Sequence, residues 1–205
     1  QTSPWFTTCV AAFTPYAKIG TEKRVMLSGI KHDQTEANFR RQNLEPADGI
    51  LIASDLRVSA VLTECTLIKT SLDIESAKML AKIGMEKRIM LSGMKRDQTE
   101  ASFYGQGLTP ADGILIASDL LFMAVLTECS LLKNNLDIES AKMLAKIGTE
   151  KRIMLSGMKR DQTEADFEYQ SLSPADGILI ASDLPFMAVL KSISLNYNSG
   201  ISGEA

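Results

Sequence analysis

The apolar positions of the chain follow two patterns that alternate along it. From Glu128 to Leu131 polar and apolar residues alternate, which is typical of a strand with one buried face. From Ile74 to Ile83 the apolar residues recur at every third position, which predicts a helix with a narrow apolar stripe. A glycine follows each such stripe and is predicted to end the helix in a left-handed conformation, at Gly20, Gly84 and Gly148. Strand, turn and helix therefore alternate.

These patterns belong to an internal repeat of 64 residues. Residues 61–124 and 125–188 differ at 11 of 64 positions, and the tetrapeptide AKIG recurs at Ala17, Ala81 and Ala145. A fixed period of this kind predicts stacked structural units. Residues 1–16 have no counterpart in the later copies. They form either an N-terminal cap on the stack or an unrelated junction.

The shorter half of each copy carries a recognisable motif. Its apolar and polar residues read LxxCxLxxNxL, with Leu126, Cys129, Leu131, Asn134 and Leu136 at the marked places. This segment resembles a leucine-rich repeat of the ribonuclease-inhibitor-like subclass. The resemblance implies an α/β solenoid, with parallel strands on the concave face and helices on the convex face. It also implies that the asparagine bonds backbone groups in the turn after the strand.

The resemblance divides the chain into alternating units of about 24 and about 40 residues. We expect one array over residues 17–205, with short units near 62–85 and 126–149, long units near 22–61, 86–125 and 150–189, and a partial unit at 190–205.

The longer half of each copy matches the same repeat less closely. Ile153 and Leu155 are interpreted as its strand residues, followed by an insertion over residues 159–171. The segment Asp161–Glu164 has the spacing of an Asp-led capping box, which predicts a short helix within the insertion, anchored by Phe167. Ser173 followed by proline predicts the start of a further helix through GILIA.

Composition and charge exclude several classes of protein. Hydrophobic residues make up 45% and charged residues 23% of the chain, and the net charge is −3, with basic residues beside acidic ones. A nucleic-acid-binding protein is therefore not expected. No apolar run reaches the length of a membrane span, and no signal peptide is visible. Cys65 and Cys129 occupy equivalent positions and are predicted to be reduced core thiols, which favours an intracellular, cytoplasmic location.

The sequence offers no catalytic or metal-binding constellation. The single histidine, His32, is replaced by Arg96 and Arg160 in the other copies, which indicates an exposed basic position. The DQTE carboxylates have no histidine or cysteine near them, and LSGMK lacks the glycine spacing of a phosphate loop. We therefore expect no enzyme activity, no cofactor and no metal.

Placing the units in register predicts three outward rows on the concave face. The first row alternates in charge and predicts a structural charge ladder through Arg24, Glu64, Arg88, Glu128 and Arg152. The other two rows are small or apolar. Together with the insertion they give these candidate partner-binding residues: Met26, Thr66, Ile68, Met90, Ser130, Leu132, Met154, Ser194, Asn196, Asp166, Glu168 and Tyr169. The methionines are either an adaptable binding stripe or ordinary core filling.

The differences between the two full copies avoid the assigned core positions. Two lie on the concave rows, two in the turn, and five in the insertion and its junction. Neutral drift of exposed sites would give the same distribution. We expect protein recognition or scaffolding, with an unknown protein as the partner. The alternatives are a structural subunit packed between neighbours in a larger assembly, and the repeat portion of a larger enzyme or nucleotide-driven switch.

Overall fold

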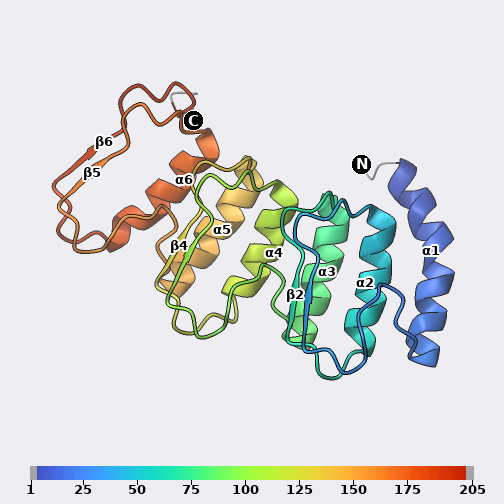
Figure 1. The fold of residues 1–205 in the computed structure, drawn as a ribbon. Coiled ribbons are helices and arrows are strands. Elements are labelled where there is room, and N and C mark those ends of the chain that lie inside the picture. The colour runs from blue at the N-terminus through green and yellow to red at the C-terminus, as the bar shows by residue number, and fades with distance from the viewer. Residues whose placement is uncertain (1–3, 202–205) are drawn as a thin grey trace. The chain divides into compact units, whose positions relative to one another are not determined.

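The computed structural model describes residues 4–201, with side chains described from residue 14 onward. These residues form two compact units built from short parallel strands and helices (Figure 1). The first unit comprises the chain up to Lys95 together with Ile114–Phe122, and the second comprises Arg96–Gly113 and the chain from Met123 onward. The architecture is therefore that of an α/β repeat protein.

The first unit contains three helices that lie side by side, with α1 packed on α2 and α2 packed on α3 (Figure 1). Its elements are α1 (Pro4–Lys23), β1 (Glu36–Asn38), α2 (Pro46–Val58), β2 (Glu64–Thr66) and α3 (Ile74–Lys87). The strands β1 and β2 are parallel. Because α1 continues from residues 4–16 into AKIG without a break, these residues extend a repeat helix that packs against α2.

The second unit repeats this arrangement. Its elements are β3 (Glu100–Ser102), β4 (Glu128–Ser130), α5 (Ile138–Lys151), β5 (Glu164–Asp166), α6 (Pro174–Asp183), the 3₁₀ turn η1 (Leu184–Phe186) and β6 (Ser192–Ser194). The pairs β3–β4 and β5–β6 are parallel, and α5 packs against α6. Helix α4 (Pro110–Leu120) contributes its first residues to the second unit and the rest to the first.

The strands of the longer repeats lie later in the sequence than predicted. Strands begin at Glu36, Glu64, Glu100, Glu128 and Glu164, so the spacing alternates between 28 and 36 residues. Met154, between the two predicted strand residues, forms one isolated bridge to Glu128. The ladder strand is Glu164–Asp166, within the predicted insertion. Residues 152–173 of the described chain contain no helix, so the predicted capping box at Asp161 is wrong.

The reason for this shift is the alternation after Glu164. Ala165 and Phe167 are buried, as Cys129 and Leu131 are in the neighbouring repeat, so the strand pairs with its inward face occupied. Phe167 is thus buried as predicted, but it anchors the residues after a strand and not a helix.

The middle residue of each strand from β1 to β5 is buried. Cys65 and Cys129 are fully buried and unpaired among the described residues, as predicted. Burial raises the pKa of each thiol from 9.0 to about 12, because the thiolate would lose its hydration. The side chain of Cys9 lies outside the described residues. These two thiols act as small apolar core residues.

The glycines after the helical stripe have a different role from the one predicted. Helices α3 and α5 run one turn further and end at Arg88 and Arg152, each with φ near 57° in the left-handed region. At Gly148 a Cβ atom would lie 2.7 Å from Leu155 Cδ1. Glycine is therefore required because the following segment crosses the helix at close range.

Two sequence signals are confirmed. Ser173 caps α6 by accepting from the Asp176 backbone, and the Asp176 carboxylate accepts from the Ser173 backbone, which completes a capping box before GILIA. The turn asparagine behaves as the motif implied. Asn134 Nδ2 donates to the carbonyls of Leu131 (2.7 Å) and Phe103 (2.9 Å). Its Oδ1 accepts from the Leu108 backbone at 3.0 Å, so the turn after β4 is fixed.

Each helix that contains the sequence GILIA has a buried aspartate near its end. This aspartate accepts hydrogen bonds from the segment that follows the preceding helix in the chain. In the second unit, Asp183 accepts from the Leu155 backbone at 2.9 Å, the Ser156 backbone at 2.7 Å and the Ser156 hydroxyl at 2.6 Å. In the first unit, Asp119 makes the same bonds to the equivalent pair, Leu91 and Ser92. We call this arrangement the aspartate clamp. It explains why residues after α3 and α5 pack inward.

Candidate recognition surface

In the strand pairs β1–β2 and β3–β4, the first outward row consists of glutamates that face one another. Glu36 lies opposite Glu64 in the first unit. Lys95 from the loop after α3 bridges them, with an ion pair to Glu64 and a second at 3.4 Å to Glu36. In the second unit Lys159 bridges the equivalent pair, Glu100 and Glu128. The carboxylates raise the pKa of each ammonium group, the glutamate of β2 or β4 most strongly. Each lysine offsets the repulsion between like charges.

The predicted charge ladder is wrong. Arg88 and Arg152 are the left-handed capping residues at the ends of α3 and α5, and Arg24 has the same conformation after α1. None of the three lies in a strand, because the clamped segment begins only after the cap. Glu64 and Glu128 do lie on the strand face, but their partners are other glutamates and the bridging lysine.

Four of the predicted contact residues are buried. Met90, Met154, Ile68 and Leu132 are each at most 1% exposed. The methionines belong to the clamped segment, which turns them into the core. This settles the open choice for those two in favour of core filling, and only Met26 of the three methionines is half-buried. Ile68 and Leu132 point inward because the chain has already entered its turn.

The remaining predicted residues do reach the surface. Asp166, Tyr169 and Asn196 are exposed, and Thr66, Ser130, Ser194 and Glu168 are half-buried. In the second unit, Ser102 and Ser130 are register partners on β3 and β4. They line a concavity of about 590 Å³ together with Tyr104 and the Glu100–Lys159–Glu128 group. This concavity gathers hydroxyls, carboxylates, an ammonium group and an aromatic ring.

The turns after the strands of the second unit carry exposed aromatic rings. Tyr169 and Tyr197 stack with ring centroids 4.2 Å apart and planes at 7°. Beside them Glu168 accepts from the Ser194 hydroxyl and from Asn196 Nδ2 at 3.0 Å, and these bonds lower the pKa of its carboxyl. On the preceding pair of turns the Lys133 ammonium lies 5.9 Å from the centre of the Tyr104 ring. Such rings provide rigid contact area with a polar end.

Several surface residues were not predicted, notably Lys95, Lys159, Tyr104 and the glutamates of β1 and β3. The reason is that the predicted long-repeat strand lies twelve residues too early, with Ile153 in the place that Ala165 occupies. The spacing of Ala165, Phe167, Gln170 and Leu172 matches that of Cys129, Leu131, Asn134 and Leu136, and this signal could have located the strand.

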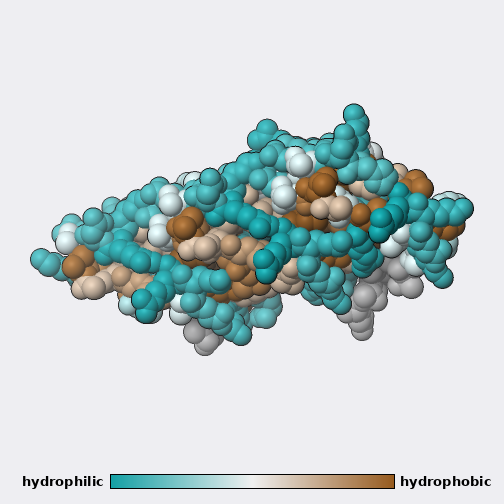
Figure 2. All heavy atoms as spheres, turned by 90° about the horizontal axis from the view of Figure 1, so that it is seen from below, coloured by the Kyte–Doolittle hydropathy of each residue, from teal (hydrophilic) through white to brown (hydrophobic). Residues whose placement is uncertain are grey.

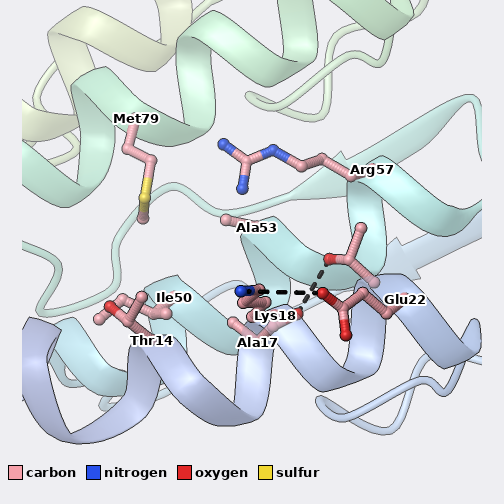
Figure 3. A pocket seen from close by; sticks show the side chains of 9 residues that line it. Thr14, Ala17, Lys18, Glu22, Ile50, Ala53, Arg57 and Met79 are labelled. Carbon is pink, nitrogen blue, oxygen red and sulfur yellow. Dashed lines mark hydrogen bonds and ion pairs between the residues drawn. The ribbon is translucent and has the colours of Figure 1, made fainter.

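A second type of concavity lies among the helices of the first unit. It measures about 580 Å³ and is lined by residues of α1, α2 and α3 (Figure 3). Ala17, Ile50, Ala53 and Met79 supply apolar surface, while Lys18, Glu22 and Arg57 supply charges. Lys18 and Glu22 form an exposed ion pair at 3.9 Å.

Apolar residues also reach the surface away from the strands. Figure 2 shows one face of the molecule on which hydrophobic residues appear in several patches bordered by hydrophilic ones. Val61, Val125 and Val189 occupy the same position in successive copies and are 43–47% exposed. These valines are the most regular exposed apolar feature of the repeat.

No protein-family model matches the chain, and a search of curated proteins finds no significant match. Among the side chains described from residue 14 onward, no three His, Cys, Asp or Glu residues gather as metal ligands. Within residues 4–201 no helix is both long and apolar enough to cross a membrane.

Proposed function

We propose that this chain is a leucine-rich-repeat solenoid that recognises a protein partner, without catalysis or a cofactor, through its strand face and the turns that follow the strands. The observation that carries this proposal is where the repeat copies differ. Positions 102/166, 104/168 and 105/169 differ between the two full copies, and all six residues are exposed or half-buried around the strand ends. Core residues between them, such as Phe103/Phe167, are unchanged.

The chemistry of the surface supports binding of protein. Tyrosine rings combined with hydroxyls and mixed charges are typical of protein recognition surfaces. The concavity around Ser102 and Ser130 carries both signs of charge, which disfavours a polyanion such as nucleic acid. The buried thiols Cys65 and Cys129 support an intracellular location.

A pull-down with matched variants tests this function. The variant Ser102→Arg/Ser130→Arg fills the strand-side concavity of the second unit with bulky charged side chains. The control, Lys142→Gln/Lys146→Gln, changes exposed positions of α5. We expect proteins captured by the wild-type chain to be lost with the strand-side variant and retained with the control. Capture that survives the strand-side change, or is lost equally with the control, contradicts the proposal.

A second candidate, a structural subunit of a larger assembly, is favoured by the repeated exposed valines. Val61, Val125 and Val189 would each meet a neighbour if copies packed side by side. The mass of the isolated chain measured over a hundredfold range of concentration tests this. A mass that stays monomeric throughout contradicts self-assembly through these residues.

A further inference from the structure

The turn after the strand of each long repeat occurs three times, with different side chains around one left-handed residue. Its left-handed residue is Arg41 in the first copy, Gly105 in the second and Tyr169 in the third, with φ of 62°, 61° and 55°. A position that accepts arginine, glycine and tyrosine in one conformation places no demand on the side chain. The turn therefore presents variable residues around one shared left-handed position.

The three versions differ in charge. Around the turn of β1 stand Asn38, Arg40 and Arg41, with two positive charges. The equivalent residues after β3 are Ser102, Tyr104 and Gly105, which are uncharged. After β5 they are Asp166, Glu168 and Tyr169, with two negative charges. The same three positions thus pass from basic through neutral to acidic along the sequence.

The basic turn, after β1, also borders a concavity. Asn38, Arg40 and Arg41 are all exposed and line a concavity of about 500 Å³ in the first unit. Asn38 Oδ1 accepts from the Arg40 backbone at 2.9 Å, which fixes the turn. Lys69 shares the left-handed conformation of Arg41 but does not line this concavity. Two arginines therefore border one hollow, and none of its described lining residues is acidic.

Guanidinium groups bind carboxylates through paired N–H donors, and a hollow of this size holds one or two acidic side chains. We propose that the Arg40–Arg41 turn of the first unit binds an acidic segment of a protein partner. This inference rests on the proposed recognition function. It adds that the first unit of the chain prefers a negatively charged segment of the partner. The equivalent turn at Asp166–Tyr169 is acidic. Its carboxylates and its stacked pair of tyrosines suit a basic segment instead.

The chain supplies the variants that test this, because each copy shows which residues the turn tolerates. The variant Arg40→Tyr/Arg41→Gly installs the neutral residues of the second copy, and Arg40→Glu/Arg41→Tyr installs those of the third. Lys142→Gln/Lys146→Gln is the control, since it removes two positive charges from exposed positions of α5 in the second unit. Unchanged circular dichroism and melting temperature verify that each variant is folded.

Binding is measured by calorimetry with hexaglutamate and hexalysine peptides at low and high salt. We expect one hexaglutamate per wild-type chain, weakened by salt, a roughly tenfold loss with Arg40→Tyr/Arg41→Gly, and no change with the control. With Arg40→Glu/Arg41→Tyr, hexaglutamate binding disappears and the number of hexalysine sites rises from one to two.

Absence of hexaglutamate binding overturns the inference, and so does equal weakening in the control. Tighter binding of a single-stranded oligonucleotide of equal charge overturns the assignment to protein. The pull-down is independent, because its variants lie in the second unit. If the Ser102→Arg/Ser130→Arg variant loses capture but the wild-type chain does not bind hexaglutamate, the recognition function stands and only the preference for an acidic segment is refuted.

Discussion

Replacing Asp183 tests the aspartate clamp directly. Its carboxylate is 1% exposed and accepts bonds from three donor groups, the backbone amides of Leu155 and Ser156 and the Ser156 hydroxyl. Burial raises the pKa of this carboxyl, against the opposing effect of those donors. In Asp183→Ala the hydroxyl can rotate to another acceptor, but the two buried amides cannot.

The expected loss follows from those two amides. An unsatisfied buried donor costs about 1–3 kcal/mol, so Asp183→Ala is expected to lower the free energy of unfolding by roughly 2–6 kcal/mol. Asp183→Asn keeps the shape and one acceptor oxygen, but turns an N–H group toward donors, and is expected to cost roughly half as much. The control Asp161→Asn is exposed and should change stability by about 0.5 kcal/mol or less.

The assay is urea unfolding followed by circular dichroism, combined with hydrogen exchange of the two clamped amides. Exchange localises the effect, because the amides of Leu155 and Ser156 lose protection before those of strands β3 and β4. The reasoning fails if Asp183→Ala lies within about 0.5 kcal/mol of the wild-type chain, or if both clamped amides stay protected.

Three further outcomes follow from the described contacts. Gly148→Ala should destabilise the chain by about 1–2 kcal/mol in thermal unfolding, because the clash with Leu155 outweighs the better helix propensity; a stabilised variant would refute this. Lys159→Gln should lower the melting temperature at low salt through repulsion of its two glutamates, with no difference at 1 M salt; a salt-independent drop contradicts it. The folded chain keeps the protons of Cys65 and Cys129 from pH 9.0 to about 12, so each thiol should make stability fall with rising pH by up to about 1.4 kcal/mol per unit; Cys129→Ala should remove about half of the combined slope in urea titrations.

The local elements were predictable where the signal was short-range. The helix starting after Ser173 and the turn asparagine Asn134 both depend on residues within a few positions of each other. The long-repeat strand was less accessible, because Ala165 is small and Gln170 stands where the motif has asparagine. Ile153, in the clamped segment, is more apolar than Ala165, so the hydrophobic pattern favours Ile153 as the buried strand residue.

The surface could be predicted only as far as the register was correct. Asp166 and Tyr169 were identified from the differences between copies, which needs no register. Met154 was placed outward because strict alternation from Ile153 was assumed. The clamp that turns it inward joins residues 28 positions apart through a buried carboxylate, and a buried charge leaves no apolar pattern in the sequence.

The repetition of the aspartate clamp also bears on how the chain finds its register during folding. The Leu91 backbone amide donates to Asp119, which lies 28 residues further along the chain. Asp183, the equivalent aspartate of the next copy, lies 92 residues further along. Loop-closure entropy favours the nearer partner by only about 1 kcal/mol. For Leu155, Asp119 lies 36 residues away against 28 for Asp183, a preference of about 0.2 kcal/mol. Chain entropy therefore selects only weakly between native and mispaired clamps.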